Sequence, residues 1–335
     1  MEHNNKPVHV LFTSVGRRVE LLRAFRRAYQ TLGIDGHIIA LDIDPLAPAL
    51  QIADRRYMVP RLSSPNYIPT LLEICRREQV QLIFPLIDPD IPMLARHRAA
   101  LEATGARLAV VAAEAAALVG DKWLTYQFFE RLDLPTPRSW LPEQRNTFPD
   151  YPLFIKPRAG SAAKHTYKVT NDRELDFFLD YVPEPIIQEY LPGAEITNDV
   201  ICTLDSEPLA VVSRRRMEVR WGEVAKGVTM YDPTIARACV RIARALPAVG
   251  PITVQCIMKD DTPCFTEINA RFGGGSPLGI AAGVDSPAML LARAAGIPFE
   301  APPLGSYQTG LHITRFDDSF FLSEEHREQM ARNHL

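Results

Sequence analysis

The sequence has 335 residues, of which 47% are hydrophobic and 23% are charged. This balance allows substantial cores, predicts two or three domains and excludes disorder as the main state. The 37 basic and 40 acidic side chains give a formal net charge of -3, which excludes a strong attractive field for nucleic acid or an anionic membrane. Any polyanionic ligand must therefore be held by a local cluster of charges.

Five cysteines are spread along the chain without a Cys-x-x-Cys pair, a pattern typical of reduced thiols rather than of disulfides or a zinc site. No uninterrupted apolar run approaches the roughly 18 residues that a bilayer-spanning helix needs. The first apolar stretch, residues 8–15, is broken by polar side chains and predicts a buried strand rather than a signal peptide. We therefore expect a soluble cytoplasmic protein that binds neither membrane nor nucleic acid.

The first third of the chain alternates short β-branched runs with helical patterns, which indicates a parallel sheet covered by helices. The pattern predicts strands at residues 8–13, 37–41, 82–85 and 107–111. It predicts helices at residues 18–32, 67–78 and 91–103, the first closed by Gly33. We assign residues 1–116 to this αβα domain.

The remaining two thirds have a different, α+β pattern. A small region, residues 117–187, begins with a helix at 122–132 that Asp121 is expected to cap. It continues with a strand at 153–156, a helix at 174–181 and a strand that starts at 186. A longer sheet region, residues 188–335, is predicted to have strands at 197–203, 209–214, 252–258, 264–269 and 310–316, and helices at 233–246 and 287–295. Residues 323–335 indicate a polar terminal helix or a frayed end.

The most informative stretch is a hairpin expected to turn near Asp261. Glu267, Asn269 and Arg271 alternate along one strand and project to one face, and in one register Gln255 lies opposite Glu267. Carboxylate and amide oxygens suit Mg²⁺, while a guanidinium suits a phosphate. Three glycines at 273–275 follow and indicate backbone close to a ligand. The alternatives are an exposed polar strand face and a flexible turn.

Two lysines form a second candidate site. Lys122 starts a helix, and Lys156 ends an apolar strand, where an unpaired ammonium is costly to bury and implies an anionic partner. The small residues after Lys156 form a loop whose backbone N–H groups are able to close over phosphates, although the loop is not a Walker A sequence. The alternatives are a surface lysine and an ordinary loop.

Two further features are compatible with small-molecule binding. The strand ending near Leu191 offers backbone groups to a purine edge, and Glu195 is able to accept ribose hydroxyls; the alternative is an inter-strand turn. The cluster at 214–216, with Arg220 and Lys226, favours a small carboxylate or phosphate over nucleic acid because no aromatics are interleaved; the alternative is a solvated edge. Residues 13–18 carry only Gly16 of a dinucleotide-binding glycine motif, so NAD binding is poorly supported.

Taken in order, these segments resemble the ATP-grasp superfamily, specifically the branch similar to half of the carbamoyl phosphate synthase large subunit and to the pyrrolysine-biosynthesis ligase. Residues 13–22, 41–45 and 84–90 look like the preceding αβα domain of that branch. Four segments look like the nucleotide and metal motifs of the family: Gly-Asp-Lys at 120–122, Ile-Lys-Pro-Arg-Ala-Gly-Ser at 155–161, Gln-Glu-Tyr-Leu-Pro-Gly-Ala-Glu at 188–195 and Glu-Ile-Asn-Ala-Arg-Phe-Gly-Gly-Gly at 267–275. The resemblance implies a parallel-sheet αβα domain followed by a two-part ATP-grasp fold: a small subdomain at 117–187 with the phosphate loop and a large subdomain at 188–335 with the metal site.

The resemblance also implies a role for each candidate residue. The residues expected to bind ATP are Lys122, Lys156, Gly160, Ser161 and Lys164 at the phosphates, Glu189, Tyr190 and Leu191 at the adenine, and Glu195 at the ribose. The residues expected to carry two Mg²⁺ ions, with Mn²⁺ as an alternative, are Gln255, Glu267 and Asn269. Arg271 and Lys156 would be catalytic, and our candidates for gripping a substrate carboxylate are Arg214, Arg216 and Lys226.

The resemblance further implies a carboxylate–amine ligase that forms an acyl phosphate and releases ADP and phosphate, with small carboxylates and amines as substrates. Such chemistry depends on positioning and charge neutralisation and needs no protein nucleophile. A homodimer is compatible with this hypothesis. One alternative is a small-acid kinase or carbamoyl-phosphate-type enzyme. Another is a catalytically silent regulatory module, because Ala162, Ala163, Lys164 and His165 replace the glycine or serine usual in related phosphate loops.

Overall fold

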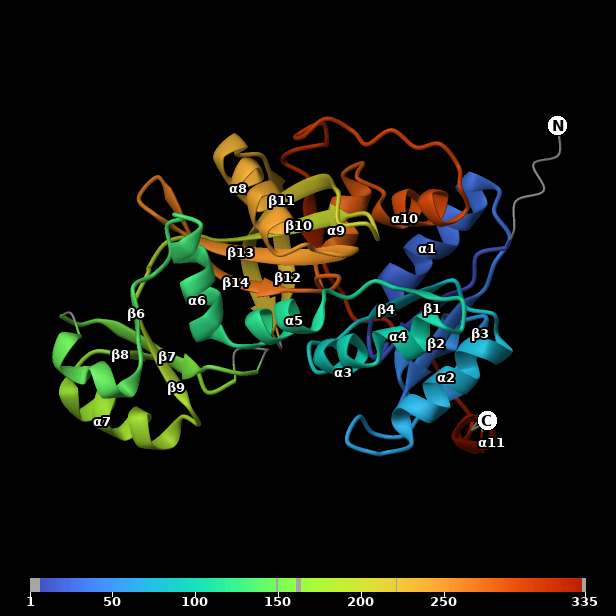
Figure 1. Cartoon of the computed structure of the whole chain (residues 1–335), viewed down its shortest axis with the longest axis horizontal. Coiled ribbons are helices and arrows are strands. Elements are labelled where there is room, and N and C mark those ends of the chain that lie inside the picture. The colour runs from blue at the N-terminus through green and yellow to red at the C-terminus, as the bar shows by residue number, and fades with distance from the viewer. Residues whose placement is uncertain (1–6, 149, 161–163, 221, 333–335) are drawn as a thin grey trace.

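The computed structural model describes residues 7–148, 150–160, 164–220 and 222–332. Over these residues the chain forms a five-stranded, a four-stranded and a six-stranded sheet. Figure 1 shows the five-stranded sheet at one end, the six-stranded sheet beside it and the four-stranded sheet at the other end. The predicted parallel-sheet domain followed by a two-part fold is confirmed, and both later sheets are antiparallel.

The five-stranded sheet is parallel and has the order β3-β2-β1-β4-β5. Its strands are β1 (Val10–Thr13), β2 (Ile38–Asp42), β3 (Arg55–Met58), β4 (Leu82–Pro85) and β5 (Arg107–Leu108). Its helices are α1 (Val19–Leu32), η1 (Pro48–Ile52), α2 (Tyr67–Arg77), α3 (Asp90–Arg96) and α4 (Arg98–Glu102). Gly33 ends α1 in the left-handed conformation, with φ of 61°, as the sequence predicts.

Two details of this domain differ from the sequence prediction. β3 was not predicted because its sequence, Arg-Arg-Tyr-Met, lacks the β-branched residues that indicate a strand. The single helix predicted at 91–103 is divided into α3 and α4 at His97, whose φ of -103° and ψ of 15° are not helical. The helical periodicity continues through this break, so the pattern does not reveal it.

The four-stranded sheet has the order β6-β9-β7-β8 and carries the segment that resembles a phosphate loop. Its elements are β6 (Ser139–Trp140), η2 (Pro142–Thr147), β7 (Leu153–Pro157), β8 (Tyr167–Val169), α7 (Asp172–Tyr181) and β9 (Pro185–Glu189). β9 continues to Glu189, so the sheet extends beyond residue 187, where the sequence placed the end of this region. The boundary at residue 116 falls inside α5 (Ala113–Gly120) and remains a prediction.

α6 (Lys122–Arg131) links the first domain to the four-stranded sheet and begins at the predicted cap. The Asp121 carboxylate accepts hydrogen bonds from the backbone N–H groups of Trp123 and Leu124, at 2.8 and 3.3 Å. This cap fixes the helix start that presents Lys122.

The six-stranded sheet is antiparallel and has the order β14-β13-β10-β11-β12-β15. Helix α8 covers one face, and α9 and α10 cover the other. Its strands are β10 (Glu195–Cys202), β11 (Pro208–Arg220), β12 (Glu223–Met230), β13 (Pro251–Lys259), β14 (Thr262–Asn269) and β15 (His312–Thr314), and its helices are α8 (Pro233–Ala245), α9 (Ser276–Ala281) and α10 (Ser286–Ala294). β12, α9 and the second half of β11 were not predicted.

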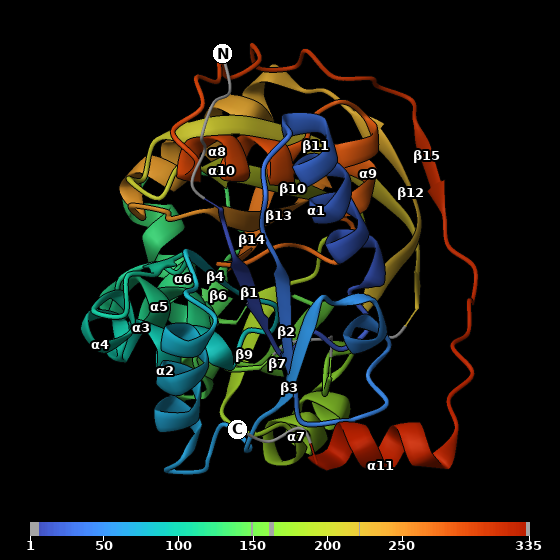
Figure 2. The ribbon, with the colours of Figure 1, turned by 90° about the vertical axis from the view of Figure 1, so that its right-hand side faces the viewer.

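The C-terminal part of the chain returns to the first domain. α10 packs against α1, and Phe272, which precedes α9, lies between Phe25 and Phe84 with ring centroids 5.9 and 5.6 Å away. Figure 2 shows the chain after β15 running along one side of the molecule to α11 (Glu324–Arg332). Met330 of α11 is buried in the core that contains these phenylalanines. The terminal segment is therefore a docked helix through Arg332.

None of the helices within the described ranges is both long enough and apolar enough to cross a membrane.

We expect Phe272→Ala to destabilise the protein by about 3–5 kcal/mol, because it empties a buried aromatic site between two domains. Chemical unfolding, followed by near-ultraviolet circular dichroism, measures the loss. Phe321→Ala is the matched control, since Phe321 is 95% exposed and its truncation is expected to change the free energy of unfolding by about 0.5 kcal/mol or less. Equal stabilities of the two variants would contradict the packing described here.

Candidate active site

The three sheets meet around a cleft of about 880 Å³. The first domain contributes the turn after β1 and the segment after β4, including Asp88; the four-stranded sheet contributes Lys156, and the six-stranded sheet contributes Glu267. The cleft gathers almost all the predicted site residues, namely Lys122, Lys156, Gly160, Lys164, Glu189, Tyr190, Leu191, Glu195, Arg214, Arg216, Gln255, Glu267, Asn269 and Arg271. Ser161 lies outside the described residues.

Lys226 does not line the cleft. It pairs in register with Glu218 on β11, and its ammonium lies 2.7 Å from the Glu218 carboxylate. The sequence prediction grouped Lys226 with Arg214 and Arg216 from their shared charge. β11 extends further than predicted, and its pairing with β12 is irregular between Arg216 and Glu218. This irregular register places Lys226 beside Glu218 instead of beside the arginines.

The β13–β14 hairpin presents the predicted acid and amide side chains to the cleft. Gln255 pairs with Glu267, and Thr253 pairs with Asn269, so the predicted register is confirmed. The three side chains supply one carboxylate and two amide groups, and oxygen donors of this kind suit Mg²⁺, which keeps water and substrate phosphates as its other ligands. Among the described residues, no group of three or more His, Cys, Asp or Glu side chains is arranged to hold a metal ion. Because its donors are oxygens, the set fits Mg²⁺ better than zinc, which Cys and His side chains usually bind.

Lys156 is buried at the end of β7, as predicted, with 7% of its surface exposed. Within the described ranges, no carboxylate forms an ion pair with its ammonium. Burial lowers the pKa of Lys156 to about 8; the nearby Glu267 charge opposes this shift and Lys122 adds to it. A positive side chain in this position favours an anionic ligand.

The segment after Lys156 is attached to α6. The Lys122 ammonium donates a hydrogen bond to the Gly160 carbonyl at 2.8 Å, and Arg158 forms an ion pair with Asp121. Lys164, at the far end of the loop, also lines the cleft. Three lysines, Lys122, Lys156 and Lys164, thus line the cleft.

The end of β9 contacts the six-stranded sheet through Glu189, and the next residue, Tyr190, contacts β8. The Glu189 carboxylate pairs with Lys259, and the Lys168 ammonium lies 4.3 Å from the centroid of the Tyr190 ring. Glu195 forms an ion pair with Arg216 and accepts a hydrogen bond from the Gln255 amide at 3.3 Å. Contacts from β11 and β13 thus hold Glu195 next to Gln255, one of the candidate metal ligands.

Arg214 lies at the floor of the cleft with 3% of its surface exposed, and it forms an ion pair with the buried Asp199. The glycines after β14 pack directly on this pair. A Cβ atom on Gly275 would lie 2.4 Å from Nε of Arg214, and one on Gly273 would lie 2.9 Å from Oδ1 of Asp199. The sequence analysis explained the glycines by contact with a ligand; the structure shows that contact with a buried ion pair also requires them.

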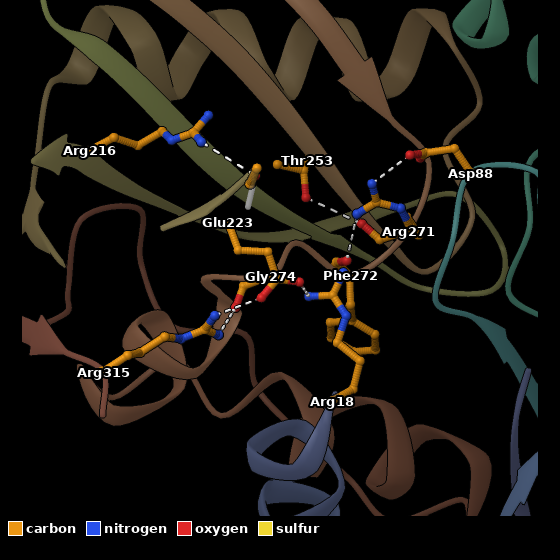
Figure 3. Close-up of polar contacts among 10 residues, drawn as sticks. Arg18, Asp88, Arg216, Glu223, Thr253, Arg271, Phe272, Gly274 and Arg315 are labelled. Carbon is orange, nitrogen blue, oxygen red and sulfur yellow. Dashed lines mark hydrogen bonds and ion pairs between the residues drawn. The ribbon is translucent and has the colours of Figure 1, made fainter. Parts of the chain in front are cut away.

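Several charged residues of the site were not predicted, among them Asp88, which follows β4. The Asp88 carboxylate lies 2.6 Å from the guanidinium of the predicted residue Arg271, which lines the cleft. Glu223, at the start of β12, lies 3.3 Å from Arg18 and 2.7 Å from Arg315. Figure 3 shows these pairs around the glycine segment.

We call Arg18, Glu223, Arg315 and Gly274 the arginine wall. Arg315 donates a hydrogen bond to the Gly274 carbonyl, and a Cβ atom on Gly274 would lie 2.8 Å from Nη1 of Arg18. Burial lowers the pKa of Arg18 to about 10. The sequence contains one indication of this cluster, the two arginines at 17 and 18 after the first strand. The sequence analysis considered this segment only as a dinucleotide-binding motif and gave the arginines no role.

Family comparisons agree with the predicted organisation. Residues 10–109 match the PylC-like N-terminal domain, and residues 119–275 match the ATP-grasp domain. The chain is 24% identical over 234 residues to a D-alanine–D-alanine ligase of Petrotoga mobilis, an alignment that covers 62% of this chain and 78% of the relative.

Solved structures share the fold. The biotin carboxylase domain of Hydrogenobacter thermophilus 2-oxoglutarate carboxylase, in complex with MgADP, ADP and bicarbonate, gives a TM-score of 0.70 at 16% identity over 92% of this chain and 74% of that one. An L-amino acid ligase of Bacillus licheniformis gives a TM-score of 0.66 at 17% identity over 89% and 76%. The chain therefore contains a PylC-like N-terminal domain followed by an ATP-grasp domain.

Proposed function

We propose that this ATP-grasp protein is an ATP- and Mg²⁺-dependent carboxylate–amine ligase. The observation that carries the proposal is the buried Lys156 ammonium, which faces the acid and amide side chains of the β13–β14 hairpin and has no ion-pair partner among the described residues. A polyphosphate with a bound cation would satisfy both groups at once.

The nucleotide would lie between the four-stranded and six-stranded sheets. Lys122, Lys156 and Lys164 border the part of the cleft proposed for the phosphates, with Gly160, and with Ser161 as the sequence predicts. Glu189, Tyr190 and Leu191 would meet the adenine, and Glu195 the ribose. The MgADP complex of the Hydrogenobacter relative supports a nucleotide in this fold.

Gln255, Glu267 and Asn269 would hold Mg²⁺, and two ions are proposed from the resemblance. The metal would neutralise charge on the transferring phosphoryl group. Arg271 would stabilise the same group after leaving Asp88, since a guanidinium binds phosphate oxygens in a fixed planar geometry.

In the first step, a carboxylate oxygen of the acid would attack the γ-phosphorus, and the bond between this phosphorus and ADP would break. In the second step, the neutral amine would attack the carbonyl carbon of the acyl phosphate. The bond from this carbon to the phosphate oxygen would break, inorganic phosphate would leave, and the nitrogen would release a proton to solvent. The residues of the chain bind and orient the reactants and compensate their charge. The names of the Petrotoga and Bacillus relatives support amide-bond formation.

The direct test is ADP release from MgATP across amino acids and other small carboxylates, each with and without candidate amines, with products identified by mass. We expect an acid and an amine to couple with loss of one water. Glu267→Gln is expected to lower ADP formation at least 100-fold while the protein stays folded, because the sole carboxylate of the proposed metal set is lost.

Wild-type turnover in Glu267→Gln would refute the metal assignment. ADP formed with the acid alone, together with a phosphorylated acid that accumulates as the final product even when amines are present, would indicate a kinase instead of a ligase. ATP binding without ADP release across the panel would favour the silent regulatory module.

The pH dependence of ATP affinity tests Lys156 separately. Only the charged lysine attracts phosphates, and its pKa in the free protein is about 8, so affinity is expected to fall as pH rises from 8 to 9.5. Lys156→Arg keeps its charge throughout this range and is expected to flatten the profile. Calorimetric titration with ATP measures both curves. Identical slopes for the two proteins would exclude Lys156 as the titrating group.

A further inference from the structure

Arg271, the proposed catalytic arginine, has a backbone that is fixed on both sides. The Arg271 carbonyl accepts a hydrogen bond from the Thr253 hydroxyl at 3.2 Å, and Thr253 pairs with Asn269 in the β13–β14 hairpin. The next residue, Phe272, is buried in the aromatic core of the first domain. Any change of partner at Arg271 therefore requires rotation of its side chain rather than movement of its backbone.

The groups of the chain satisfy the Arg271 guanidinium only in part. Its Nη2 lies 2.6 Å from Oδ2 of Asp88, and its Nη1 donates a hydrogen bond to the Phe272 carbonyl at 3.1 Å (Figure 3). Its Nε is buried and has no hydrogen-bond partner within the described residues, which is unfavourable for a charged donor. Nε and Nη2 share one edge of the planar group, where an anion with two free oxygens is able to bind both. The single contact with Asp88 is therefore one that a phosphate can replace.

Asp88 is held in place by its own domain. It lies in the turn between β4 and α3, where its carbonyl accepts a hydrogen bond from the Ile91 N–H at 3.2 Å. Asp90, two residues further on, is fully buried, and its carboxylate accepts hydrogen bonds from the hydroxyls of Thr13 and Ser14 at 2.5 and 3.2 Å. These contacts tie the turn to the end of β1, so Asp88 stays with the first domain when the arginine changes its partner.

The pair lies beside the site proposed for phosphoryl transfer. Asp88 and Arg271 both line the cleft, as do Glu267 and Asn269 of the proposed metal set. The side chains of Arg271 and Asp88 are 14% and 27% exposed, so water screens their charges only in part. While the two are paired, their charges cancel and a γ-phosphoryl group gains little from the arginine. Once they separate, the arginine adds a positive charge where phosphoryl transfer needs it.

We propose that Asp88 is a positioning residue that holds Arg271 away from the γ-phosphoryl group of ATP until the acid is bound. This inference rests on the proposed ligase function and adds a restraint to its first step. The acid has to bring its carboxylate to the γ-phosphorus, where this second carboxylate competes with Asp88 for the one guanidinium.

The restraint limits the hydrolysis of ATP in the absence of the acid. In that side reaction the oxygen of water bonds to the γ-phosphorus, the bond from this phosphorus to ADP breaks, and a proton passes to solvent. With Arg271 held by Asp88, this transfer lacks the guanidinium that stabilises it.

Nucleotide binding tests the restraint without turnover. The probes are ADP and the non-hydrolysable β,γ-methylene analogue of ATP, each with Mg²⁺, and calorimetry measures their affinities. Asp88→Asn keeps the shape of the side chain but removes the charge that holds Arg271. We expect the affinity for the analogue to rise at least fivefold in this variant, and the affinity for ADP, which lacks the γ-phosphoryl group, to change less than twofold.

Asp205→Asn is the matched control. Asp205 also forms an ion pair between the first domain and the six-stranded sheet, with Arg107, but it does not line the cleft. We expect this variant to bind the analogue within twofold of the wild-type affinity. A fivefold gain in Asp205→Asn as well would overturn the proposal, because loss of any ion pair between the domains would then explain the result.

Arg271→Ala separates the restraint from simple repulsion between Asp88 and the phosphates. If Asp88 acts through Arg271, then adding Asp88→Asn to Arg271→Ala is expected to change the affinity for the analogue less than twofold. Direct repulsion by Asp88 would be relieved whether or not the arginine is present. A fivefold gain in both backgrounds, or in neither, would overturn the proposal.

ADP release from MgATP without acid or amine tests the consequence of the restraint. We expect Asp88→Asn to release ADP at least tenfold faster than the wild-type protein and Asp205→Asn. Equal rates in the three proteins would overturn the proposal.

The restraint and the ligase fail separately. The expected affinities and hydrolysis rates, in a protein that couples no acid to an amine, would support the restraint and refute the ligase. Coupled product from a protein in which Asp88→Asn leaves both nucleotide affinities unchanged would refute the restraint and support the ligase.

Discussion

Charge buried where the three sheets meet is the constraint on which the structure depends. Around one cleft, Arg214 and Lys156 are buried, and the side chains of Arg18 and Arg271 are only 15% and 14% exposed. An uncompensated buried charge costs several kcal/mol. The three arginines are compensated by acids of the chain, Glu223, Asp199 and Asp88. Within the described residues the lysine has no such acid, and the proposed function follows from this difference.

The same constraint joins the domains to the site. Asp88 belongs to the PylC-like domain and Arg271 to the ATP-grasp domain, so their ion pair forms only when the two domains are docked. The next residue, Phe272, enters the aromatic core of the first domain, and the glycines that follow allow the backbone to contact Arg18 and Arg214. Docking of the two domains therefore also assembles this side of the cleft.

Local patterns predicted the parts of the site that depend on neighbouring residues. The register of Gln255 with Glu267 follows from a short hairpin, the Asp121 cap from a single turn, and the burial of Lys156 from an apolar strand. Asp88 and Arg271 are separated by 183 positions, and no local pattern reveals such a pair. Glu223 was not predicted because it starts β12, a strand that was not predicted either. Lys226 was assigned to the wrong place because residues of like charge were assumed to share one face. Local patterns therefore reach about the length of one hairpin, whereas the gathering of distant candidate residues in one cleft was expected only from the family resemblance.

The transfer of ¹⁸O tests the acyl phosphate at the centre of this account most directly. The acid is labelled in both carboxylate oxygens and incubated with MgATP and the amine, and the mass of the released inorganic phosphate is measured. Because the acid oxygen that attacks phosphorus stays with it when the amine displaces phosphate, the account predicts one labelled oxygen in each phosphate released. Coupled product accompanied by unlabelled phosphate would contradict it.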